Sequence, residues 1–209
     1  MKIICFIALF FTPLIQTQPI GKSDTESQGN EAWKLEKDKD GIKVYTRHVE
    51  GYQIKEFKAV SIIEAKMEDI LTLVLDAEHY AEWMSNTTSA KTIKTEENGD
   101  FLVYYQLSLP WPMKDRDAIS QNQIISGTDS TVIRTVLLPD YLPEDSKLVR
   151  MKVANGGWVF KPLADNRCHL TYQFVADPST KVPGWIANLF VVESPYETIF
   201  NLKERLEKN

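Results

Sequence analysis

The feature of this sequence that most constrains its fold is a series of short strand-like segments that begins near Ala90. The segments are rich in β-branched and aromatic residues, and the residues between them read Asn-Gly, Gly-Thr-Asp, Asn-Gly-Gly and Ala-Asp-Asn, which favour tight turns. Strands joined by such short turns pair antiparallel, because a parallel pair needs a long crossover connection. The series therefore predicts an antiparallel meander. Its expected strands are 91–96, 101–109, 117–125, 131–138, 148–154, 158–162 and 168–175.

Strands are also expected before this series. The dipeptide Asp40-Gly41 is a hairpin signal, and it predicts paired strands at 33–36 and 42–48. A further segment rich in β-branched and aromatic residues spans 54–63. Together with the meander, these segments predict a sheet of seven or more strands.

Two segments change to helical spacing, because their apolar residues recur three and four positions apart. They are 66–83 and 181–208, and the second carries a wide apolar surface. Pro195 lacks an amide hydrogen, so we expect it to kink the second helix. The predicted fold class is α+β: a curved antiparallel sheet wrapped around a long C-terminal helix, with space between them for an apolar pocket.

The stretch 104–119 crosses from one expected strand to the next through a Pro-Trp-Pro corner. Arg116 and Asp117 are adjacent at the start of the second strand, so their side chains point to opposite faces of the sheet. An inward arginine needs a carboxylate, a row of carbonyls or the polar end of a ligand, because an unpaired buried charge costs several kcal/mol. The alternative is an arginine in a solvated ion pair at the surface.

Composition excludes several functions. The chain has 209 residues, a net charge of −5 and no basic run, so nucleic acid is not an expected partner. The three histidines are scattered without metal-ligand spacing, and no glycine-rich phosphate loop is present. The sequence therefore predicts no metal, no cofactor and no catalytic group. Cys168 is expected to be a small core residue.

The N-terminus is typical of an exported protein. Lys2 precedes an apolar run from Ile3 to Ile15, which is too short to span a bilayer, and a polar segment follows. We expect a signal peptide at 1–21, a flexible leader at 22–31 and one ligand-binding domain at 32–208. The protein would then be periplasmic or extracellular. The alternative is an uncleaved anchor or a disordered apolar tail.

Several segments, taken in order, resemble one family. The matching segments are Trp33 with Asp40-Gly41-Ile42-Lys43-Val44-Tyr45, then Asp76 to Trp83, Pro110 to Asp117, Gly157-Trp158 with Pro162 and Tyr172, Asp177-Pro178, and Val182-Pro183-Gly184-Trp185 with Asn188. Through these segments, from about Ala32 to Leu206, the chain resembles a START domain, the lipid-transfer module related to steroidogenic acute regulatory protein. A bacterial, exported member of this family is the expectation.

The resemblance implies a helix-grip fold with one hydrophobic tunnel. It also implies non-enzymatic binding, and possible transfer, of a lipid or other hydrophobic ligand. The final helix would act as a gate near Pro195, Arg116 would hold a polar head group, and Asp117 would point outward. Sterol-binding members place an acidic residue before the corner, whereas 104–108 here has none. An anionic phosphate or carboxylate on the ligand therefore fits Arg116 better.

The expected ligand contacts combine this resemblance with the strand patterns. Tyr104 and Gln106 share one face of their strand, although the opposite face, with Tyr105 and Leu107, is equally plausible as the inner one. The tryptophans would line the cavity or belong to an ordinary core. The expected ligand-binding set is Arg116, Tyr104, Gln106, Trp83, Trp158, Tyr172, Trp185, Leu189 and Phe190.

Two other functions stay open at this point. One is an enzyme of the cyclase or aromatase type on the same fold, which would need an acid or a base inside the tunnel. The other is a ligand-sensing module that acts through a protein partner. For the favoured lipid carrier, the expected partners are the lipid itself and a transiently contacted membrane, and the expected oligomeric state is a monomer.

Overall fold

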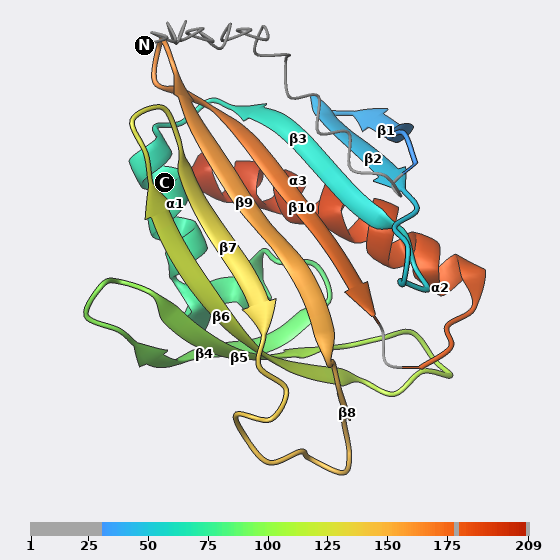
Figure 1. Cartoon of the computed structure of the whole chain (residues 1–209). Coiled ribbons are helices and arrows are strands. Elements are labelled where there is room, and N and C mark those ends of the chain that lie inside the picture. The colour runs from blue at the N-terminus through green and yellow to red at the C-terminus, as the bar shows by residue number, and fades with distance from the viewer. Residues whose placement is uncertain (1–30, 178–179, 208–209) are drawn as a thin grey trace, which may run out of the picture.

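The computed structural model describes residues 31–177 and 180–207. The expected signal peptide, and the expected leader up to Asn30, lie outside the described residues. Ten strands form one curved sheet in the order β1-β2-β3-β10-β9-β7-β6-β5-β4, with β8 paired to β6 (Figure 1). The strands are β1 (Lys34–Lys39), β2 (Ile42–Arg47), β3 (Glu56–Ile63), β4 (Thr87–Thr95), β5 (Phe101–Leu107), β6 (Arg116–Ser126), β7 (Thr131–Leu137), β8 (Val149–Arg150), β9 (Val153–Leu163) and β10 (Arg167–Asp177).

The predicted hairpins are largely confirmed. Asp40 and Gly41 both have positive φ, at 53° and 71°, as a tight hairpin between β1 and β2 requires. From β4 through β7 each strand pairs antiparallel with the next one in the chain. The sheet then continues through β9 and β10 to β3, so the meander closes against the N-terminal strands.

One predicted turn is wrong. Asn155-Gly156-Gly157 lies inside the long strand β9, which already begins at Val153. Of the strand expected at 148–154, the part before β9 forms only the short β8, which runs parallel to β6. A side chain at Gly156 would place its Cβ 2.0 Å from the backbone oxygen of Gln173, and at Gly157 the Cβ would lie 1.9 Å from that of Ile133. The glycines therefore permit close approach of neighbouring strands.

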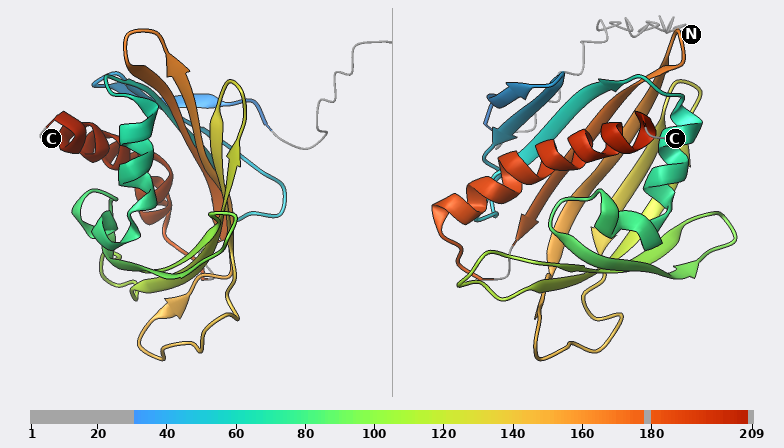
Figure 2. Two further views of the ribbon diagram at one scale, coloured as in Figure 1. Left: turned by 90° about the vertical axis from the view of Figure 1, so that its left-hand side faces the viewer. Right: turned by 180° about the vertical axis from the view of Figure 1, so that it is seen from behind.

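The helices cover the concave face of the sheet (Figure 2). The predicted helix over 66–83 is found as α1 (Met67–Leu75) and a 3-10 helix, η1 (Ala77–Glu82), because Asp76 between them leaves the helical region with ψ 81°. The predicted C-terminal helix is found as α2 (Gly184–Asn188), a π-helical segment η2 (Leu189–Glu193) and α3 (Ser194–Glu207). The irregular segment ends just before Pro195, as expected for a residue that cannot donate to the helical ladder.

The core lies where α3 and α1 pack on the sheet. Ile199 and Leu202 of α3 are fully buried, and each contributes about 1.5–3 kcal/mol by leaving water. Cys168 is also fully buried in this cluster, which confirms the prediction of a core position. None of the helices in the described part of the chain is long and apolar enough to cross a membrane.

Candidate functional site

A cavity of about 180 Å³ lies between the concave face of the sheet and the C-terminal helical segment. Its sheet side is contributed mainly by β5, β6, β7, β9 and β10, and its helical side by η2 and the first turns of α3. The sheet curves around this space while the helix closes it, so the cavity follows from the predicted architecture (Figure 2).

Aromatic side chains form much of the cavity wall. Trp158 and Tyr172, opposite each other on β9 and β10, stack with ring centroids 3.9 Å apart. The Phe57 ring meets Tyr172 edge to face at 5.1 Å. Such rings offer a large apolar surface to a ligand in a rigid arrangement. The other aromatic residues in the wall are Tyr80, Tyr105, Phe174 and Phe190.

Alternation along β6 places one polar row in the wall. Arg116, Ser120 and Asn122 share the face that lines the cavity, because side chains two positions apart in a strand point the same way. Thr135, directly opposite Asn122 on β7, joins them. The cavity is thus polar along β6 and aromatic along β9 and β10.

Arg116 is 2% exposed, and its guanidinium is held by neutral acceptors. Its Nη1 donates to the Lys114 carbonyl at 2.7 Å, and its Nη2 donates to Thr180 Oγ1 at 2.8 Å. Its Nε has no hydrogen-bond partner among the described residues. Burial lowers the pKa of Arg116, and the nearby Asp115 charge opposes this shift. Within the described ranges no carboxylate comes within ion-pair distance of Arg116.

The other positively charged residue of the cavity wall has a carboxylate partner, unlike Arg116. Lys55 lies 3.5 Å from a carboxylate oxygen of Glu36, so its charge already has a partner. Arg116 is therefore the wall cation whose charge a ligand anion would balance.

Asp117 points away from the cavity, as the resemblance implied, but not toward solvent. It is 1% exposed and forms a two-point ion pair with Arg150, at 3.0 Å from Nε and 2.8 Å from Nη2. Arg150 also donates to the carbonyls of Pro139, Leu142 and Pro143. The loop that covers the outer face of β6 is thus tied down at the position next to Arg116.

The cavity tyrosines are neutral hydrogen-bonding groups. Burial raises the pKa of Tyr105 to about 12, and it also raises the pKa values of Tyr80 and Tyr172. The Tyr80 hydroxyl donates to the Val74 carbonyl at 2.6 Å and is therefore engaged. No aspartate, glutamate or histidine belongs to the described wall, and the described residues hold no cluster suited to a metal ion.

The structure brings five of the sequence-predicted residues together in the wall and leaves five outside it. The five in the wall are Arg116, Trp158, Tyr172, Phe190 and Pro195. The predicted contacts that lie outside it are Tyr104, Gln106, Trp83, Trp185 and Leu189. A role in binding stays a prediction for all of them.

The physical reasons for these placements differ. Tyr104 and Gln106 occupy the outer face of β5 and hydrogen-bond each other at 3.0 Å, so Tyr105 and Leu107 are the inner pair. Trp83 is 1% exposed and packs in the core against Tyr80, with ring centroids 5.6 Å apart.

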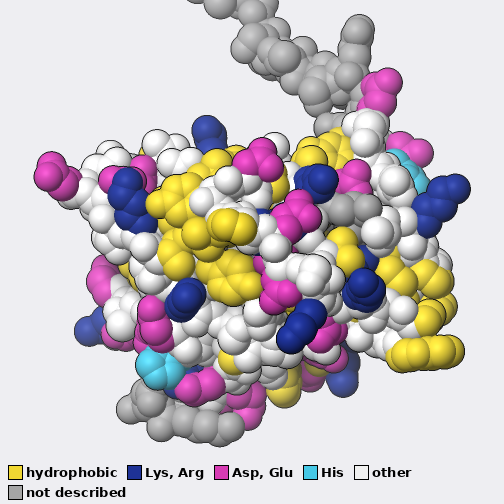
Figure 3. All heavy atoms as spheres, turned by 90° about the horizontal axis from the view of Figure 1, so that it is seen from below, with side chains coloured by type: hydrophobic (Ala, Val, Ile, Leu, Met, Phe, Trp, Pro, Cys, Tyr) yellow, Lys and Arg dark blue, Asp and Glu magenta, His cyan; other side chains and the backbone are white. Residues whose placement is uncertain are grey.

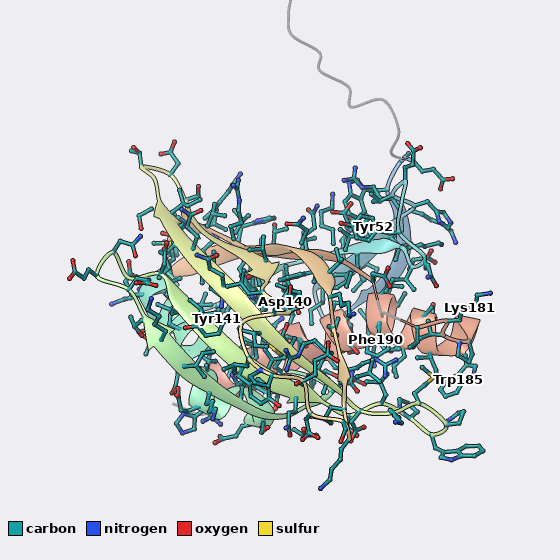
Figure 4. All side chains as sticks on the ribbon, turned by 60° about the horizontal axis from the view of Figure 1, so that its bottom comes forward. Tyr52, Asp140, Tyr141, Lys181, Trp185 and Phe190 are labelled. Carbon is teal, nitrogen blue, oxygen red and sulfur yellow. The ribbon has the colours of Figure 1, made fainter. Side chains whose placement is uncertain are left out.

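Trp185 and Leu189 lie toward the outer end of the helical segment, and Trp185 is 57% exposed. Figure 4 shows Trp185 and Lys181 at this end and Phe190 further in.

Sequence reasoning missed the polar residues of the wall. Once Arg116 is taken as inward, a period of two along its strand points to Ser120 and Asn122, so a signal for these two existed. Thr135 and Phe57 had no such signal, because they reach the cavity only through cross-strand registers that form in the folded sheet.

Comparisons with known proteins agree with this geometry. The family model described as START domain matches residues 22–209. An uncharacterised protein of Pseudomonas aeruginosa is 34% identical over 179 residues, which is 85% of this chain and 88% of the relative. The solved structure of a STAR-related lipid transfer protein fragment from Xanthomonas axonopodis has a TM-score of 0.78 at 33% identity, over 85% of this chain and 99% of that chain.

More distant matches fall into two groups. The phosphatidylcholine transfer protein of Bos taurus is 23% identical over 164 residues, 75% of this chain and 76% of the relative. The Zhui aromatase/cyclase of Streptomyces sp. R1128 is similar in fold alone, with a TM-score of 0.54 at 13% identity over 75% of this chain and 95% of that chain.

Proposed function

Because this chain belongs to the START domain family, we propose that its cavity binds a lipid or other hydrophobic molecule with an anionic head group and carries it without chemical change. Arg116 carries this proposal: a buried cation in the cavity wall whose partners among the described residues are neutral. An opposite charge 4 Å away is worth about 4 kcal/mol at an effective dielectric constant near 20. A phosphate or carboxylate would supply that charge.

The aromatic wall would hold the hydrophobic part of the ligand. Burial of apolar surface contributes about 25 cal/mol per Å², so a few hundred Å² of ligand surface gain several kcal/mol. Relatives named as lipid transfer proteins, and one named for phosphatidylcholine transfer, support a lipid as the ligand class. An acid–base enzyme of the cyclase type is not favoured, because the described wall carries neither carboxylates nor imidazoles.

We further propose transient contact with a membrane at the open end of the cavity. The loop between β5 and β6 lies beside the segment that leads into α2 (Figures 1 and 2), and Arg116 bonds Thr180 across the two. Trp111 in this loop is 88% exposed and Trp185 of α2 is 57% exposed. In the view from below, hydrophobic side chains gather at this edge (Figure 3). Indole rings favour the boundary between lipid and water.

Export and a monomeric state complete the proposal. The basic start and apolar run of residues 2–15 support export to the periplasm or the cell exterior. For such a carrier we expect a monomer.

The test compares two probes of equal chain length, octadecanoate and octadecanol, on Arg116→Gln. We expect the dissociation constant of octadecanoate to rise at least about tenfold, or ~1.4 kcal/mol, and that of octadecanol to change little, because only the carboxylate uses the guanidinium charge. Quenching of tryptophan fluorescence measures both. Arg134→Gln, an exposed arginine on β7, is the control. Equal loss of both probes would contradict the head-group role of Arg116.

A further inference from the structure

The sheet side of the cavity carries a polar cluster well away from Arg116. Ser120, Asn122 and Thr135 all line the cavity and are 3%, 7% and 6% exposed. Ser120 lies four positions after Arg116 along β6, which corresponds to about 13 Å of strand. The three side chains therefore line a part of the cavity that is well separated from Arg116 along the sheet.

The hydrogen bonds of this cluster leave it with capacity for a ligand. Asn122 Nδ2 donates to Ser120 Oγ at 2.9 Å, and Thr135 Oγ1 donates to Asn122 Oδ1 at 2.8 Å. A hydroxyl has one donor and two acceptor positions. The proton of Ser120 and the lone pairs of Thr135 take part in no other hydrogen bond within the described residues, so the pair can both donate and accept.

A cavity wall for a plain hydrocarbon chain would gain from apolar side chains at these positions. Each buried polar group costs about 1–3 kcal/mol when it is left without full hydrogen bonding. The cavity wall adds Tyr105 of the neighbouring strand β5 and Tyr172 of β10, whose pKa values burial raises, so that both hydroxyls stay neutral. Neutral donors and acceptors suit a neutral oxygen on the ligand, in contrast to the charge at Arg116.

From these observations we propose that Ser120, Asn122 and Thr135 form a second, neutral subsite, and that the ligand carries a hydroxyl or carbonyl oxygen partway along its hydrophobic chain in addition to its anionic head. This inference rests on the proposed function of the same cavity. The subsite selects mid-chain oxygenated amphiphiles over ligands with unsubstituted chains, and it fixes how deep the ligand sits.

The experiment uses three probes that share one chain: octadecanoate, 12-hydroxyoctadecanoate and 3-hydroxyoctadecanoate. The two hydroxylated isomers have the same overall polarity and differ only in where the oxygen lies. We expect the 12-hydroxy isomer to bind about fivefold tighter than the 3-hydroxy isomer, the ratio that roughly one net hydrogen bond gives.

Two substitutions test whether the polar cluster causes the preference for the 12-hydroxy isomer. Ser120→Ala and Thr135→Val should each reduce the preference for the 12-hydroxy isomer toward unity, while octadecanoate binding persists. Thr131→Val is the matched control, because Thr131 is a buried threonine on the same strand, β7, outside the cavity wall.

The outcomes separate the two proposals. Equal affinity for the two isomers, with octadecanoate still bound, would overturn the second subsite and leave the proposed function standing. A preference that survives in both variants would overturn the assignment to these residues. Failure of all three probes to bind would overturn the proposed function and the subsite with it.

Discussion

At the residue scale, the buried ion pair between Asp117 and Arg150 also holds the loop that covers the outer face of β6. Both side chains are 1% exposed, and Arg150 gives its remaining donors to carbonyls of the loop at 139–143. Removal of one charge from such a pair leaves the other buried without a partner, which is more costly than the net value of the pair. Asp117 is adjacent to Arg116 on β6, so the pair also holds in place the backbone of the residue that we propose binds the head group.

We predict that Arg150→Ala lowers the free energy of unfolding by about 3–5 kcal/mol, because Asp117 then loses its buried counter-charge. Urea unfolding followed by tryptophan fluorescence measures the change. Lys43→Ala is the control: its ion pair with Asp38, at 3.2 Å, is half exposed and should be worth less than about 1 kcal/mol. A small loss from Arg150→Ala, similar to that of the control, would show that the buried pair does not stabilise the fold in this way.

At the element scale, β9 connects the two halves of the sheet, since it pairs with β7 on one side and β10 on the other. A Cβ at Gly156 would overlap a backbone oxygen of β10, and a Cβ at Gly157 would overlap a backbone oxygen of β7. Backbone oxygens in a paired strand cannot move aside as a flexible side chain can. The pairing of β9 with both of its neighbours therefore depends on these two positions.

Gly156→Ala and Gly157→Ala should each destabilise the protein by about 3 kcal/mol or more, because neighbouring strands must separate to admit the methyl group. Chemical denaturation and the yield of soluble protein would report the effect. Gly184→Ala provides the comparison: no atom lies within 4 Å of its added Cβ, so the change should stay within about 0.5 kcal/mol. Wild-type stability in both β9 variants would mean that the strands do not need this close approach.

At the scale of the whole molecule, the two most exposed large apolar side chains of the described structure, Trp111 and Trp185, belong to elements far apart in the sequence. The β5–β6 loop that carries Trp111 nevertheless lies beside the segment that leads into α2, where Arg116 bonds Thr180, and we propose that the cavity opens there. A lipid that leaves a bilayer at this end would pass the arginine and reach the aromatic wall without crossing water. The net charge of −5 disfavours a strongly anionic surface, so the expected membrane is a zwitterionic one.

Trp111→Ala should reduce partition onto phosphatidylcholine vesicles about tenfold, because the indole ring no longer enters the interface. Stability should change by less than about 0.5 kcal/mol, since the side chain is 88% exposed. Vesicle sedimentation measures the partition. Leu163→Ala is the control: Leu163 is an exposed leucine at the C-terminal end of β9, away from the β5–β6 loop, and its loss should leave partition unchanged. Unaltered partition of the Trp111 variant would exclude this loop as the contact.

Local sequence patterns were sufficient to predict most of the strands and helices, because turn residues and side-chain periodicity act over a few neighbouring positions. Asp40-Gly41 favours the positive φ of a tight hairpin turn, and Pro195 cannot donate a backbone hydrogen bond to a helix in any context. The same locality explains the error at Gly156-Gly157. Two glycines permit either a turn or a close crossing of strands, and only the neighbouring strands decide which.

The sequence by itself determined the α+β class, the antiparallel pairing and the long broken C-terminal helix. It also determined that the adjacent Arg116 and Asp117 point to opposite faces of the sheet. Tertiary structure decided which face of β5 is inner, and so placed Tyr105 in the wall and Tyr104 outside it. It also gave Asp117 a partner 33 residues away and aligned Thr135 with Asn122 across two strands. These outcomes depend on sheet curvature and cross-strand register, which arise only when distant segments pack together.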